Sequence, residues 1–63
     1  MINYIKKSFD FYEVMIDEYY AGDIISCDST MIFIQCDVTC ITIHDYELDE
    51  INEFCDNLNK EVL

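Results

Sequence analysis

The sequence predicts one small α+β domain, with an antiparallel sheet of about three strands, a C-terminal helix and an N-terminal helix. Three observations lead to this fold class. Apolar residues recur at helical spacing near the C-terminus, the middle of the chain is rich in β-branched and aromatic residues, and the first twenty residues again show a helical rhythm. The 63 residues leave room for a single domain, 1–63.

The first twenty residues allow two interpretations. Their apolar side chains follow a helical spacing with polar residues opposite, which favours an amphipathic helix ended by Gly22. The same segment is rich in aromatic and β-branched residues, which favours strands joined at a turn at Ala21 and Gly22. We expect at least a partial helix here. The residues in the helical rhythm are Ile2, Ile5, Phe9, Tyr12, Ile16 and Tyr19.

The middle of the chain has the composition of strands. Residues 23–27, 31–36 and 38–44 contain many β-branched and aromatic side chains with polar residues between them. Asp28 and Ser29 are typical turn residues between the first two of these segments. Cys36-Asp37 is the expected hairpin turn before the third, so these segments predict a three-stranded meander.

The last third of the chain predicts a helix over 46–61. Asp45 is a suitable N-cap, acidic residues fill the first turns, and Lys60 lies near the end, as the helix dipole favours. The apolar stripe of this helix consists of Leu48, Ile51, Phe54, Cys55, Leu58 and Val62.

Charge is the most informative feature for function. Fourteen Asp and Glu residues face three lysines and no arginine, which gives a formal net charge of −11, yet 52% of the residues are hydrophobic. The chain therefore has the composition of a folded domain and not of a disordered acidic tail. This balance disfavours direct binding to nucleic acid or to anionic membranes, and it favours a basic protein partner.

The acids are densest between residues 45 and 56. On a helix this span would extend about 17 Å, at a rise of about 1.5 Å per residue. One DNA strand presents about five phosphates over that length. Tyrosines, which are favoured anchors in interfaces, adjoin the acids. The residues expected to contact a partner are Asp45, Tyr46, Glu47, Asp49, Glu50, Glu53, Asp56, Glu18, Tyr19 and Tyr20.

The cysteines and the single histidine do not form a strong catalytic or metal motif. We expect Cys27, Cys36, Cys40 and Cys55 to be free thiols that serve as small buried hydrophobes. The spacing Cys36-x3-Cys40-x3-His44 leaves a zinc site as an alternative, with Cys27 or Cys55 as a fourth ligand. A nucleophilic set of Cys40 or Cys55 with His44 and Asp45 carries no supporting signature. We therefore expect neither an enzyme nor a cofactor.

Size and targeting signals bear on the setting of the protein. A chain of this length buries only about 60% of its unfolded surface, so a basic partner or a homodimer would add needed stability. The start of the chain lacks the basic, apolar and small-residue order of a secretory signal, and the longest apolar run, residues 31–34, is too short for a membrane span. These features predict a cytoplasmic protein.

In size, acidity and clustered acids such as DYELDEINEFCD (residues 45–56), the chain resembles small inhibitors encoded by phages and mobile elements. These include acidic anti-CRISPR proteins, inhibitors of uracil-DNA glycosylase and other DNA-mimic proteins. The resemblance implies occupation of a nucleic-acid-binding groove on a host nuclease or repair enzyme, in the host cytosol. The alternative hypothesis is a small structural or regulatory subunit that self-associates or joins a larger assembly.

Overall fold

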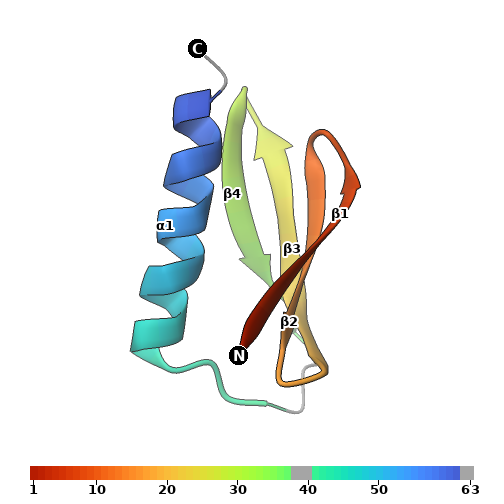
Figure 1. Ribbon diagram of the computed structural model, residues 1–63, viewed down its shortest axis with the longest axis vertical. Helices are drawn as coiled ribbons and strands as arrows, with labels where there is room; N and C mark the ends of the chain where they lie inside the picture. Colours follow the sequence, from red (N-terminus) through yellow and green to blue (C-terminus); the bar gives the residue numbers. More distant parts are fainter. Residues whose placement is uncertain (38–40, 62–63) are drawn as a thin grey trace.

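The computed structural model describes residues 1–37 and 41–61, which form a four-stranded antiparallel sheet and one helix (Figure 1). The α+β class is confirmed, whereas the N-terminal helix and the count of three strands are wrong. The sheet has the order β1-β2-β3-β4, so each strand pairs with the next along the chain. The elements are β1 (Ile2–Ser8), β2 (Phe11–Ile16), β3 (Tyr19–Cys27), β4 (Thr30–Gln35) and α1 (Asp45–Glu61).

The N-terminal segment forms β1 and β2 because its burial follows a period of two. Tyr12, Val14 and Ile16 are buried, while the residues between them are only partly buried. The helical rhythm was misleading because it combined side chains from different places. Ile5 points to the face opposite Ile16, and Phe9 lies in the turn between β1 and β2 with 85% of its surface exposed.

Two hairpins close on two-residue turns with left-handed backbone. Asp17 and Glu18 join β2 to β3 with φ values of 49° and 76°. Asp28 and Ser29 join β3 to β4 with φ values of 51° and 66°, which confirms the predicted turn at these two residues. This backbone matches the twist of antiparallel strands and favours Asn-Gly or Asp-Gly pairs, neither of which is present here.

The left-handed backbone at Ser29 gives a direct stability prediction. Ser29→Gly should raise the free energy of unfolding by about 1 kcal/mol, because glycine adopts positive φ without the steric cost of a Cβ. The matched control is Ser26→Gly in the extended part of β3, which should lower it by about 0.5–1 kcal/mol. Urea unfolding followed by circular dichroism measures both changes, and equal effects of the two substitutions would contradict the turn geometry.

Gly22 lies inside β3, so it neither ends a helix nor forms a hairpin turn as the sequence suggested. The pairing of β2 with β3 shifts between Val14 and Met15, and Gly22 follows this irregularity with φ 156°. The chain of β4 passes so close to Gly22 that a Cβ would lie 2.3 Å from the Ile34 carbonyl oxygen. Gly22 is therefore required by the approach of two strands.

The segment after β4 departs from the predicted hairpin. Cys36 N–H donates to the Ala21 carbonyl oxygen at 2.9 Å, so Cys36 still lies beside β3 and Cys36-Asp37 is not a hairpin turn. Of the strand predicted over 38–44, residues 38–40 lie outside the described residues, and residues 41–44 are not a strand. Ile41 and Ile43 instead pack against the core on the way to α1.

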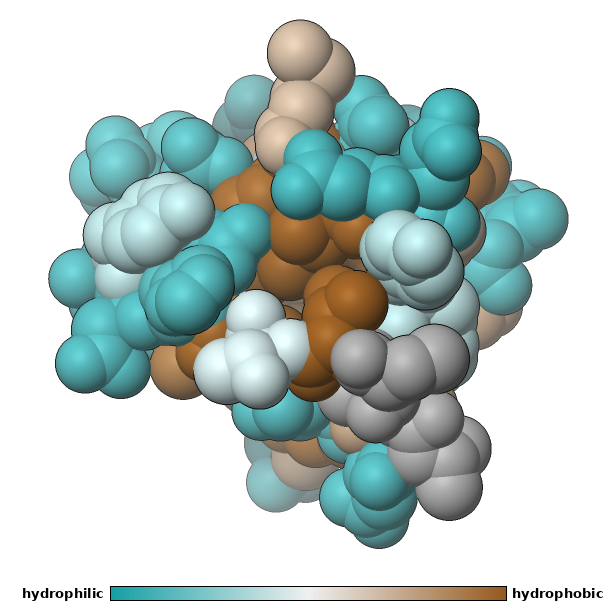
Figure 2. Space-filling view, turned by 90° about the horizontal axis from the view of Figure 1, so that it is seen from below, coloured by the Kyte–Doolittle hydropathy of each residue, from teal (hydrophilic) through white to brown (hydrophobic). Residues whose placement is uncertain are grey.

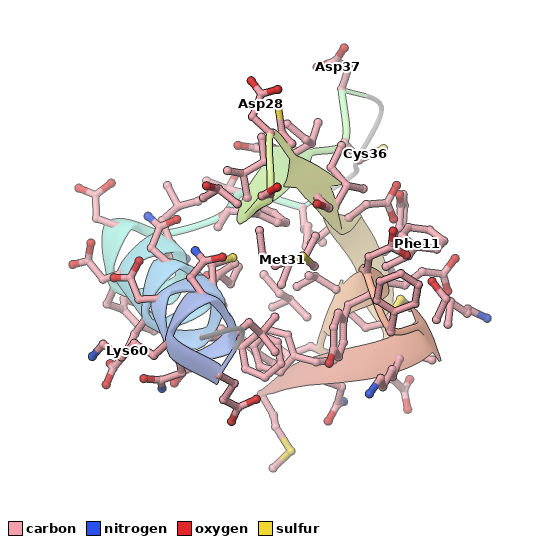
Figure 3. All side chains as sticks on the ribbon, turned by 90° about the horizontal axis from the view of Figure 1, so that it is seen from above. Phe11, Asp28, Met31, Cys36, Asp37 and Lys60 are labelled. Carbon is pink, nitrogen blue, oxygen red and sulfur yellow. The ribbon has the colours of Figure 1, made fainter. Side chains whose placement is uncertain are left out.

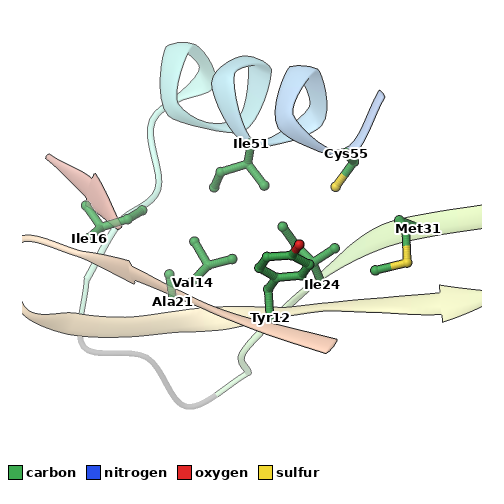
Figure 4. Close-up of a cluster of buried hydrophobic side chains, with 8 residues drawn as sticks. All are labelled: Tyr12, Val14, Ile16, Ala21, Ile24, Met31, Ile51 and Cys55. Carbon is green, nitrogen blue, oxygen red and sulfur yellow. The ribbon is translucent and has the colours of Figure 1, made fainter. Parts of the chain in front are cut away.

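α1 covers one face of the sheet and completes the core, as the predicted apolar stripe requires (Figure 4). Ile51 and Cys55 of the helix are buried, and Phe54 stacks on Tyr4 of β1 with ring centroids 3.8 Å apart. Burial raises the pKa of Tyr4 to about 12. Val62 of the predicted stripe lies outside the described residues. The core residues are Tyr12, Val14, Ile16, Ala21, Ile24, Met31, Ile51 and Cys55.

Candidate partner-binding surface

The first turn of α1 is capped by His44 and Glu47. The His44 carbonyl oxygen accepts hydrogen bonds from the backbone N–H groups of Glu47 and Leu48, both at 3.0 Å. In return the Glu47 side chain accepts from the His44 N–H through Oε1, also at 3.0 Å. His44 is therefore the N-cap residue and Asp45 the first helical residue, so the prediction of Asp45 as N-cap is wrong by one position.

This cap removes Glu47 from the predicted row of exposed acids. Only 7% of the Glu47 surface is exposed, and its carboxylate is held by the backbone of the helix start. A glutamate three residues after the N-cap is the acceptor half of a capping box. The usual Ser or Thr is replaced by His44, which is why the pattern was missed in the sequence.

Glu47→Ala should lower the free energy of unfolding by about 1 kcal/mol, because the His44 N–H loses its acceptor at the helix start. Glu50→Ala is the matched control, since Glu50 is exposed in the same region of the helix. Glu50→Ala should leave stability unchanged or raise it slightly by removing repulsion between like charges. Thermal and urea unfolding of both variants provide the measurement. Equal destabilisation by the two substitutions would contradict the role of Glu47 as a cap.

Five of the six remaining helix acids, all except Glu61 at the end of α1, form one exposed surface, which we call the acidic helix face. Within residues 1–37 and 41–61, the ion pairs are Met1–Asp17 and Lys7–Glu13, so no ion pair there involves α1. Lys60, in the last turn, is the only basic residue of the helix. The acidic helix face consists of Asp45, Asp49, Glu50, Glu53 and Asp56, all exposed.

Two of the predicted tyrosines adjoin the start of this face. Tyr46 is 71% exposed and its ring stacks on His44, with centroids 5.6 Å apart. Tyr19, which is 55% exposed, lines the same hollow of about 210 Å³ as Tyr46. Figure 2 views this end of the molecule and shows apolar surface surrounded by polar side chains. We call this hollow, which is lined by Tyr19, Tyr46 and His44, the basal hollow.

Glu18 and Tyr20 do not join the acidic helix face. Glu18 is exposed in the turn between β2 and β3. Tyr20 is opposite Met15 in the sheet, on the face away from α1. A hydrogen bond to Asp23, followed by partial burial, raises the pKa of Tyr20 to about 12. The structure therefore divides the predicted contact residues between the helix, the basal hollow and the far face of the sheet.

The cysteines do not share one environment. Cys55 is buried in the core, and burial raises the pKa of its thiol, whereas Cys27 is exposed and Cys36 is half-buried. The expectation of small buried hydrophobes therefore holds for Cys55 alone among these three free thiols. Cys40, which the zinc hypothesis needs, lies outside the described residues. In the part of the chain that the structure describes, no three potential metal ligands gather.

The comparisons with known proteins add no relative. No protein-family model, curated protein or solved structure matches this chain. Among the described residues, no helix has the length and apolar character needed to cross a membrane. Any proposal about function therefore depends on the chain's own residues and their placement.

Proposed function

We propose that this protein is a non-catalytic inhibitor that binds a basic, nucleic-acid-binding protein of a host defence or repair system. The observation that carries the proposal is the acidic helix face. Its five carboxylates are exposed along one side of α1 without an ion-pair partner among the described residues. They span about 17 Å of helix axis, over which one DNA strand places about five phosphates.

The chemistry of inhibition follows from this similarity in charge density. The carboxylates would pair with the lysines and arginines that hold phosphates in the partner. They would thereby exclude nucleic acid from the partner's binding groove, in the manner of a DNA-mimic or anti-CRISPR inhibitor. The field of a chain with net charge −11 would also accelerate encounter with a basic surface. Tyr19 and Tyr46 at the basal hollow would anchor the end of the contact.

The arrangement of the acids has an internal penalty that binding would relieve. Glu53 follows Asp49 by four residues and Glu50 by three, and it precedes Asp56 by three. Each pair of like charges at these spacings destabilises the helix by about 0.2–0.5 kcal/mol. A partner that neutralises the face removes the repulsion and stabilises the fold by mass action.

The proposal predicts that location of charge matters more than its amount. The triple variant Asp49→Asn, Glu50→Gln, Glu53→Gln should bind the partner about tenfold more weakly, from roughly 0.5 kcal/mol lost at each contact. The matched control neutralises three exposed or partly exposed acids elsewhere, Asp10, Asp28 and Asp37, as asparagines. Both variants remove three charges from the net −11.

The measurement is affinity capture from the native host with quantitative mass spectrometry, followed by titration calorimetry with the captured protein at low and high salt. The wild type and the control variant should retain one nucleic-acid-binding enzyme, the helix variant should lose it, and high salt should weaken binding. Equal weakening by both variants, or affinity independent of salt, would rule out a specific contact through the acidic helix face.

A structural or regulatory subunit is the second candidate, and the uncovered face of the sheet favours it. In that case the acids only maintain solubility, and the helix variant should stay in its assembly. Analytical ultracentrifugation of the wild type and the triple variant distinguishes the two functions, because only the structural candidate predicts self-association, to the same extent in both proteins.

A further inference from the structure

The sheet has a second face that nothing in the described chain covers. α1 packs on the side that holds Met31, and Phe11 points to the opposite side (Figure 3). We call this opposite side the outer sheet face. The strand register places on it the side chains Ile5, Phe11, Met15, Tyr20, Ile25, Ile32 and Ile34, together with the polar residues Asn3, Ser8, Glu13, Asp23 and Thr30. Lys7 joins this face through its ion pair with Glu13.

The composition of this face is unusual for a surface in contact with water. Antiparallel sheets with one covered face normally place polar side chains on the other. Here Ile5 is 42% exposed and Ile34 is 48% exposed, and neither packs against the core cluster. Apolar residues gathered in this way mark an interaction surface.

Two carboxylates lie at the centre of the apolar residues. Glu13 is directly opposite Asp23 across β2 and β3, and like charges in that position destabilise a sheet. The same row continues to Ile5 on β1 and Ile34 on β4, so apolar side chains flank the pair on both sides.

The described chain supplies one positively charged side chain to this pair of carboxylates. Lys7 Nζ lies 3.5 Å from Glu13 Oε1 and partly compensates that carboxylate. Asp23 accepts a hydrogen bond from Tyr20, but its Oδ1 is shielded from solvent and has no donor among the described residues. A cationic donor from outside the chain would complete the pair.

We propose that the outer sheet face binds an amphipathic segment of a partner protein that places one arginine or lysine, flanked by apolar side chains, over Glu13 and Asp23. Four strands spaced about 4.8 Å apart accommodate one helix of about 10 Å diameter. A second copy of this chain would oppose four carboxylates with only two copies of Lys7. This surface is on the other side of the sheet from the acidic helix face and does not depend on it.

The test uses two synthetic helical peptides of identical composition. One carries a single arginine at the centre of a leucine-rich face, and its isomer carries the same arginine on the polar side. Binding to the isotope-labelled protein is followed by backbone NMR shifts. The central-arginine peptide should bind about tenfold more tightly and shift residues of β2, β3 and β4 on the outer sheet face.

The double variant Glu13→Gln, Asp23→Asn should fold normally and should no longer prefer the central-arginine peptide. The variant with three substitutions on the acidic helix face should keep that preference. Equal affinity of the isomers, or shifts confined to α1, would overturn the proposal. Self-association in the ultracentrifuge that Ile34→Lys abolishes would also overturn it, in favour of a second copy as the occupant. Failure of the acidic helix face as a partner site would leave these results unchanged, so the two proposals are separable.

Discussion

Gly22→Ala should lower the free energy of unfolding by about 3 kcal/mol, which is most of the roughly 3–5 kcal/mol that a core of this size supplies. A Cβ at this position would lie 2.3 Å from the Ile34 carbonyl oxygen, 2.9 Å from Phe33 Cε1 and 3.0 Å from Gln35 Cα. Two of these atoms, the Ile34 oxygen and Gln35 Cα, belong to the backbone of β4 and cannot rotate away. The φ of 156° adds strain for any residue with a side chain.

The control for this substitution is Ser26→Ala, which lies in the same strand and is exposed. It should change stability by less than about 0.5 kcal/mol. Urea unfolding monitored by far-ultraviolet circular dichroism compares both variants with the wild type. A Gly22→Ala protein with a wild-type midpoint would show that β3 and β4 are not as close as described.

Asn59→Ala should lower the free energy of unfolding by about 2 kcal/mol, because one side chain satisfies two backbone groups of an edge strand. Asn59 Oδ1 accepts from the Met31 N–H at 2.7 Å, and its Nδ2 donates to the Met31 carbonyl oxygen at 3.2 Å. Asn59 of the helix thereby occupies the free edge of β4, which no fifth strand pairs with in the described chain. Without Asn59 this edge has unpaired groups that can recruit another chain.

Asn57→Ala is a well-matched control, because Asn57 is exposed on the same helix and has the same helix propensity as Asn59. It should leave stability nearly unchanged. Amide hydrogen exchange at Met31 supplies a local readout that should accelerate only in Asn59→Ala. Unchanged exchange at Met31 would contradict the pairing even if the overall stability fell.

Local sequence signals were sufficient to predict an element whose residues follow a single repeating pattern. The stripe from Leu48 to Leu58 predicted α1 because a helix packed on one side needs apolar residues at a spacing of three and four. The turn at Asp28 and Ser29 and the strands around it were also predicted, since turn residues separate two runs of β-branched side chains. The cap at His44 was missed by one residue, because its acceptor Glu47 could equally belong to the exposed acids.

The N-terminal hairpin could not be predicted in the same way, and the reason is physical. A sheet with apolar residues on both faces loses the alternation that identifies a strand. Ile5 and Met15 on the outer sheet face fill positions where a polar residue would have revealed the period of two. Ile5 also contributed to the apparent helical rhythm of the segment by coincidence. Thus the feature that hid the fold also created the second candidate surface.

By itself the sequence determined the acidity of this protein, its α+β class and the helix that carries seven of its fourteen acids, because composition and helical spacing are local properties. Only the tertiary structure decided that Glu47 caps the helix, that Tyr20 lies on the far side of the sheet from α1, and that Glu13 is opposite Asp23. These relations depend on strand pairing between residues distant along the chain. Pairing register assigns every side chain to one face or the other, and no local pattern in this chain specified that register.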